Sequence, residues 1–124
     1  MDYDKFVKEV RTRAAIDDRS EAEGAALVVL QTLVDRLTPA EADDLTAQLP
    51  EPLKSSLTVN GAPSRMSATE FVERVADTLQ IGPEEARTRI RAVFSVLEDA
   101  VTPGELHDVL VQLPSGIYEM VNAG

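Results

Sequence analysis

The stretch "LTPAEADDLTAQLP" at Leu37–Pro50 returns as "VTPGELHDVLVQLP" at Val101–Pro114, and this repetition decides how we expect the chain to fold. Each version has Thr-Pro, then Glu, then Asp three residues later, and ends in Gln-Leu-Pro. Thr is a favourable N-cap, Pro suits the first helical position, and a later Pro ends a helix. The two stretches therefore predict two short equivalent helices, near Thr38–Gln48 and Thr102–Val111.

The repetition extends along most of the chain. "FVKEV" at Phe6–Val10 matches "FVERV" at Phe71–Val75, and about 16 of roughly 49 paired positions are identical, which indicates internal duplication. Between the copies lies "TVNGAPSR", whose Asn-Gly and Pro are typical of a linker. We therefore expect one helical repeat at residues 1–57, a linker at 58–65 and a second repeat at 66–124.

Apolar residues at helical spacing predict a long second helix in each repeat. The two stripes occupy equivalent positions: Ala22, Ala26, Val29, Leu30, Leu33 and Leu37, and then Ala86, Ile90, Val93, Phe94, Leu97 and Val101. "SATE" at residues 67–70 and "SEAE" at residues 20–23 have the form of capping boxes, which mark helix starts. Helices are expected near residues 2–14, 20–36, 38–48, 52–57, 67–78, 83–100, 102–111 and 114–121. The predicted fold is all-α, with two tandem repeats of three to four helices each packed as one compact bundle.

The composition argues against several classes of partner. The chain has 22 acidic and 12 basic residues and a net charge of −10, so it is repelled by nucleic-acid phosphates and anionic lipid heads. The start "MDYDKFVKEV" lacks the features of a signal peptide, and the longest apolar run, "AALVVL", is too short to span a bilayer. We expect a cytoplasmic protein that binds neither nucleic acid nor membrane.

The sequence offers little material for catalysis. It has no cysteine, one histidine (His107), and no glycine-rich nucleotide motif. Thiolate chemistry and zinc-thiolate sites are excluded, and Ser-His or Cys-His catalysis is disfavoured. We expect no enzymatic activity, no cofactor and no metal site.

One pattern of carboxylates occurs in both repeats. Glu41 and Asp44 lie three residues apart near a helix start, and Glu105 and Asp108 repeat them. They could form a repeated cation or partner site, or they could be a capping-box Glu and an Asp at the positive end of a helix dipole. We favour the second interpretation, because capping alone accounts for both glutamates. Helix rules then leave two repeated pairs on one helix face without a role, namely Asp44 with Gln48 and Asp108 with Gln112.

Two differences between the repeats are candidate functional features. Leu27 and Val34 stand where the second repeat has Arg91 and Glu98, so they add an apolar edge to the second helix. This edge could lie in the contact between the repeats, or it could be a surface for a partner helix or a second copy. A candidate anion patch in this acidic chain consists of Arg74, Arg87 and Arg91. The default there is in-helix pairing of Glu84 and Glu85 with Arg87 and Arg89.

The motif order also resembles a known family. F-[LV]-x-x-V, a long Glu-Ala-rich helix and L-T-P-x-E-x-x-D-L-x-x-Q-L-P, given twice, resemble the bacterial domain-of-unknown-function family 2267 over nearly the whole chain. Members of that family typically have "GGEAxDLxAQLP" where this chain has "TPAEADDLTAQLP". The resemblance implies a small, soluble, all-helical protein without an assigned activity. It supplies no catalytic residues, and the ending "LPSGIYEMV" departs from the usual acidic and aromatic finish.

These observations favour an interaction role. We expect a non-enzymatic intracellular protein-interaction or adaptor module that binds a protein partner or self-associates, with Leu27 and Val34 as the candidate surface. The alternative is a sensor domain that binds a small anionic ligand in a cleft between the repeats, near the three arginines.

Overall fold

Eight helices make up the computed structural model of the chain, which describes residues 1–122, and none of these residues lies in a strand. The helices are α1 (Tyr3–Arg13), α2 (Arg19–Arg36), α3 (Pro39–Ala47), α4 (Leu53–Ser56), α5 (Ala68–Leu79), α6 (Pro83–Ala100), α7 (Pro103–Leu110) and α8 (Ser115–Asn122). The all-α prediction is confirmed, and each helix end lies within one residue of its expected position. The last two residues of the second expected repeat, 123 and 124, lie outside the described residues.

Side-chain caps begin most of these helices, as the sequence predicts. Ser67 and Glu70 form a complete capping box at α5, in which each side chain accepts from the other residue's backbone N–H. The capping box expected at residues 20–23 was wrong. Helix α2 is capped instead by Asp18, whose carboxylate accepts from the N–H of Ser20 at 3.3 Å. Glu23 lies on the next turn and accepts a hydrogen bond from the Tyr3 hydroxyl.

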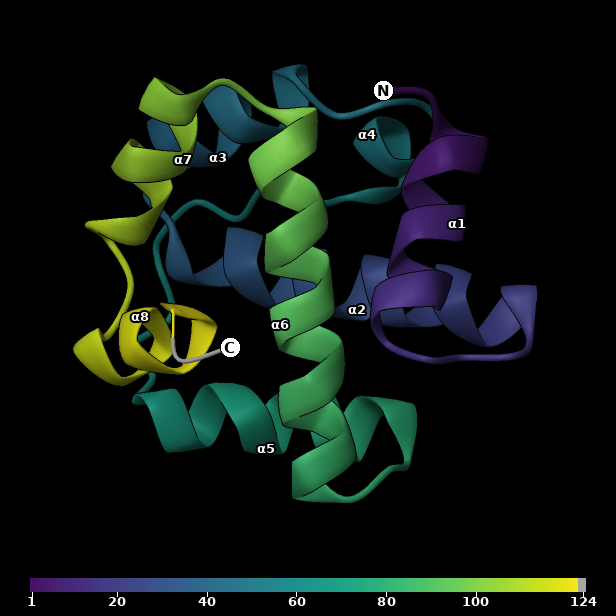
Figure 1. Ribbon diagram of the computed structural model, residues 1–124. Coiled ribbons are helices and arrows are strands. Elements are labelled where there is room, and N and C mark those ends of the chain that lie inside the picture. Colours follow the sequence, from purple (N-terminus) through teal and green to yellow (C-terminus); the bar gives the residue numbers. More distant parts are fainter. Residues whose placement is uncertain (123–124) are drawn as a thin grey trace.

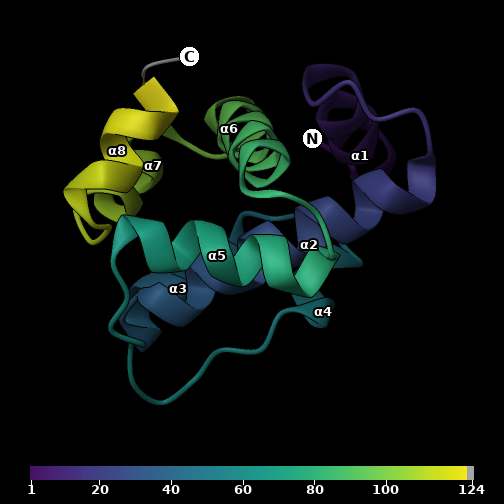
Figure 2. The ribbon, with the colours of Figure 1, turned by 90° about the horizontal axis from the view of Figure 1, so that it is seen from below.

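The two long helices, α2 and α6, cross in the middle of the molecule (Figure 1). Helix α1 packs against both of them, and α5 also packs against both. Seen from below, α1 and α8 flank α6, while α5 lies beside α2 (Figure 2). Helices α1 and α2 of the first half therefore contact α5 and α6 of the second half, and all four bury their apolar faces in one common core.

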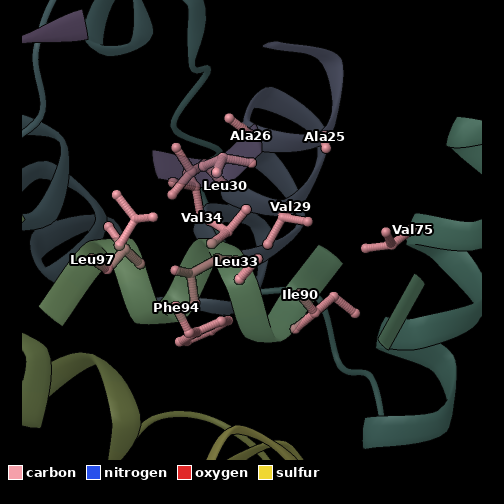
Figure 3. Close-up of a cluster of buried hydrophobic side chains, with 14 of the residues drawn as sticks. Ala25, Ala26, Val29, Leu30, Leu33, Val34, Val75, Ile90, Phe94 and Leu97 are labelled. Atoms are coloured by element: carbon pink, nitrogen blue, oxygen red, sulfur yellow. The ribbon is translucent and has the colours of Figure 1, made fainter. Parts of the chain in front are cut away.

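Both predicted apolar stripes lie in that core. All twelve of their residues are buried, and Figure 3 shows Leu30 and Leu33 of α2 close to Phe94 and Leu97 of α6. The three phenylalanines of the chain, Phe6, Phe71 and Phe94, have no exposed surface. Each such side chain contributes about 1.5–3 kcal/mol by leaving water, so these residues on α1, α5 and α6 add substantially to the stability of the common core. Within residues 1–122, no helix combines the length and apolar character needed to cross a membrane.

Helices α3 and α7 form a separate pair at one corner of the molecule, where Figure 1 shows them together. Each follows a long helix after a short turn at Thr38 or Thr102, which places the two repeated motifs against each other. This corner therefore brings together the residues of the opening repeat that helix rules left unexplained.

Candidate functional site

Two glutamine side chains tie α3 and α7 together. The backbone N–H of Thr38 donates to Gln112 Oε1 at 3.0 Å, and the backbone N–H of Thr102 donates to Gln48 Oε1 at 2.9 Å. Gln48 follows α3 and Thr102 precedes α7, so the end of each helix caps the start of the other and the two helices are antiparallel. This exchange explains the repeated glutamines. Sequence reasoning missed it because each partner lies in the other repeat.

The exchange also changes what the repeated glutamates do. Thr38 and Thr102 cap their helices through side chains that accept from the N–H groups of Glu41 (3.4 Å) and Glu105 (3.3 Å). In a capping box the glutamate side chain would also accept the backbone N–H of the threonine. At the starts of α3 and α7 this second bond is absent, because a glutamine side chain already accepts that N–H. Capping therefore does not account for the two glutamate side chains, and that prediction was wrong.

The two glutamates instead face each other between α3 and α7. Glu41 is 9 % exposed and Glu105 is 8 % exposed, and the Oε1 atom of each is buried without a hydrogen-bond partner. With the carboxylate of Asp108, at the exposed edge of α7, they form a group whose oxygen atoms lie within 4.8 Å of one another. Burial and the contact with Glu105 raise the pKa of Glu41 from 4.5 to about 8, and the charges of Asp108 and Asp44 add to this.

This arrangement can hold either a proton or a cation. Two buried carboxylates in contact repel each other, so one must be neutralised or both must share a positive charge. Among residues 1–122, Glu41, Glu105 and Asp108 are the group of side chains close enough together to hold one metal ion. Asp44, the equivalent of Asp108, is exposed on α3 beside them. The signal for this site in the sequence is the repeated Glu and Asp three residues apart, which allowed a cation site as the less favoured interpretation.

The two residues of the expected apolar edge, Leu27 and Val34, differ in their burial. Leu27 is 36 % exposed, whereas Val34 is 2 % exposed and belongs to the core cluster drawn in Figure 3. Helix α2 contacts α1, α5 and α6, so it is buried over a wider face than one stripe. Val34 therefore packs inside the molecule and is not part of an exposed surface. Leu27 lines a groove of about 290 Å³ together with Val28, Gln31, Thr32, Asp35, Ser56, Arg74 and Thr78.

The three arginines of the candidate anion patch have different surroundings. Arg74 lines the Leu27 groove and lies 4.0 Å from Asp35, measured from Nη1 to Oδ2. Arg87 pairs with Glu84, as expected from their spacing on α6. Arg91 lines another cavity, of about 330 Å³, together with residues that include Arg13 and Glu98. The structure thus places Arg74 and Arg91 in separate cavities.

Comparison with known proteins gives a family but no activity. A family model described as "Uncharacterized conserved protein (DUF2267)" matches residues 3–120, which is nearly the whole chain. No curated protein matches the chain. The description names neither a substrate nor a functional residue, so any statement about function depends on the geometry.

Proposed function

The chain belongs to the DUF2267 family of uncharacterized conserved proteins, and we propose that it is a non-enzymatic intracellular interaction module that binds an amphipathic partner helix in the groove between α2 and α5. One observation carries this proposal: Leu27, a large apolar residue that lines that groove, is 36 % exposed. Its apolar neighbour Val28 is half-buried, while Gln31, Asp35 and Arg74 line the groove with polar groups. A groove that combines exposed apolar surface with polar groups suits one face of an amphipathic helix.

Charge favours a basic partner over a second copy. Each chain carries a net charge of −10, so two copies would repel each other, whereas a basic helix would be attracted. The cation in the groove, Arg74, already lies beside Asp35, which leaves little positive charge there to repel such a helix. Self-association is therefore an outcome of the test and not part of the proposal.

The internal duplication supports a scaffold role. We infer that the two halves are tandem repeats, because equivalent helices make equivalent contacts: α1 packs on α6 as α5 packs on α2. The exchanged caps of Gln48 and Gln112 are likewise equivalent. Leu27 breaks this equivalence: its counterpart is Arg91, which lines the corresponding cavity together with Arg13 of α1, so an exposed apolar residue in one groove is replaced by a charged one in the other.

An anion sensor is the weaker alternative. Two of the three arginines that it requires, Arg74 and Arg87, already lie against a carboxylate. An incoming anion would have to compete with Asp35 and Glu84 at those positions, and both competitors belong to the chain itself.

A labelled peptide tests the groove directly. The probe is an amphipathic Leu–Lys helix of about five turns, and a Leu–Glu helix of the same length is its control. Leu27→Gln should weaken Leu–Lys binding about two- to fivefold, because the exposed part of one leucine contributes about 0.5–1 kcal/mol when buried. Val111→Gln is the matched control, since Val111 is 66 % exposed at the end of α7. Fluorescence anisotropy gives the affinities.

Two results would contradict the groove assignment. In one, Leu27→Gln and Val111→Gln leave the affinity for the Leu–Lys peptide equally unchanged. In the other, analytical ultracentrifugation of the wild type shows a dimer that Leu27→Gln dissociates, which would make a second copy the occupant.

A further inference from the structure

We propose that Glu41, Glu105 and Asp108 bind one hard divalent cation, such as Ca²⁺ or Mn²⁺, between α3 and α7. This site is independent of the Leu27 groove and uses residues from both halves of the chain. The proposal depends on the spacing of the carboxylate oxygens, on the unpartnered buried oxygens, and on the way the two helices are held.

The spacing suits a single ion. The three carboxylates each offer an oxygen, and these oxygens lie within 4.8 Å of one another. Two oxygens on opposite sides of a Ca²⁺ ion stand about 5 Å apart, since each Ca–O distance is about 2.3–2.6 Å. One ion can therefore contact all three side chains with little movement of either helix. The smaller Mg²⁺ ion, at about 2.1 Å from its ligands, would need the carboxylates drawn closer together.

Within the described part of the chain, the buried carboxylate oxygens of Glu41 and Glu105 have no positively charged partner. Oε1 of Glu41 and Oε1 of Glu105 are both buried and both without a hydrogen-bond partner, although each residue is more than nine-tenths buried. The charged groups that act on Glu41 come from both helices and are all acidic: Asp44, Glu105 and Asp108. Buried charges in proteins are normally paired or bound to a metal. A divalent cation would supply the missing partner for both oxygens at once.

The chemistry of the donors selects the class of ion. Carboxylate oxygens are hard ligands that suit Ca²⁺, Mn²⁺ and Mg²⁺, while zinc sites use mainly nitrogen and sulfur. Asp108 is exposed, so an ion can enter from its side and keep water molecules as further ligands. Asp44, also exposed and near Glu41, is placed to accept hydrogen bonds from those waters.

The exchanged caps hold the two halves of the site in place. Gln112 binds Thr38 twice, accepting from its backbone N–H at 3.0 Å and donating to its Oγ1 at 3.3 Å. Gln48 accepts the backbone N–H of Thr102 at 2.9 Å. These bonds fix the register of α3 against α7, and a fixed frame lowers the cost of gathering ligands around an ion.

A single shared ion also explains which residues are identical between α3 and α7 and which differ. Glu, Asp and Gln recur at equivalent positions of α3 and α7, whereas the neighbouring Asp43 is replaced by His107 in the second repeat. Asp43 and His107 are both exposed and neither belongs to the cluster. One ion on the line between the two helices would use the same residue types from each repeat.

The test uses chelator-stripped protein and Mn²⁺ as the probe. Electron paramagnetic resonance should show about one bound Mn²⁺ per chain, and added Ca²⁺ should displace it. Glu105→Gln should weaken Mn²⁺ binding roughly tenfold or more, and Asp108→Asn should weaken it too, because each removes a charged ligand. Asp43→Asn is the matched control: it removes the same charge from an exposed position on α3 and should leave the affinity nearly unchanged.

Two outcomes would overturn the proposal. The first is that the folded wild type binds no Mn²⁺ at millimolar concentration. The second is that Asp43→Asn weakens binding as much as Glu105→Gln, which would indicate diffuse attraction by an acidic surface. Far-UV circular dichroism confirms that each variant is folded, and the exposed Asp108→Asn serves if Glu105→Gln does not fold.

Discussion

Replacing Glu41 with Gln should make the metal-free protein more stable at alkaline pH. In the wild type, the Glu41 carboxyl faces Glu105 in a buried position, with Asp44 and Asp108 close by. Above its pKa of about 8 it becomes a second buried anion. Gln has nearly the same shape but carries no charge, and its amide can donate a hydrogen bond to the carboxylate of Glu105.

The sign and size of the effect follow from the pKa of Glu41. Folding raises this pKa from 4.5 to about 8, so the folded state binds a proton more tightly than the unfolded chain does. The resulting stability is fully present below about pH 4.5 and is lost as the pH rises toward 8. The loss amounts to about 5 kcal/mol for this difference in pKa, a large share of the 5–15 kcal/mol typical of a domain.

Urea denaturation in chelator at pH 5, 7 and 9, followed by far-UV circular dichroism, measures the effect. Glu41→Gln should match the wild type at pH 5 and exceed its unfolding free energy by up to about 5 kcal/mol at pH 9. Glu73→Gln, at an exposed position of α5, makes the same change in net charge and is the control. The reasoning is refuted if the wild type keeps its stability from pH 5 to pH 9, or if the control gains as much as Glu41→Gln.

Two further pairs of variants test the packing. Gly116→Ala should destabilise the protein by about 1–3 kcal/mol, since its Cβ would lie 2.7 Å from the Cβ of Ala68, whereas Gly24→Ala, with open space around it, should gain about 0.5–1 kcal/mol. Equal effects of the two alanines in thermal denaturation would argue against the docking of α8 on α5. Val34→Ala should cost about 1–3 kcal/mol and Leu27→Ala about 1 kcal/mol or less, because only Val34 is fully packed. The reverse order in urea denaturation would contradict the burial described for α2.

Much of the fold could be read from local signals. Thr-Pro starts, apolar stripes and Gln-Leu-Pro ends placed every helix to within a residue, because capping and helical periodicity depend on neighbours a few positions away. The cap of α2 was misassigned because local signals allowed two choices and a tertiary contact favoured one of them. Asp18 and Ser20 are both good caps, and the tertiary contact of Glu23 with Tyr3 removes the side chain that would have favoured Ser20.

Local signals indicated the candidate site only as an alternative to helix capping. Glu41 has the spacing of a capping-box glutamate, and only the presence of Gln112 at the N–H of Thr38 shows why it does not act as one. In the same way, the spacing of Val34 and Leu27 on α2 could not tell which of the two would be covered by neighbouring helices.

The sequence by itself determined the helices, the apolar faces that form the core, and the repetition of Glu, Asp and Gln in two equivalent segments. The tertiary structure decided that these segments lie antiparallel, exchange their caps and bring two glutamates together out of water. The reason is physical: a helix forms from contacts within a few residues, whereas a buried carboxylate pair needs two chain segments more than sixty residues apart to pack face to face.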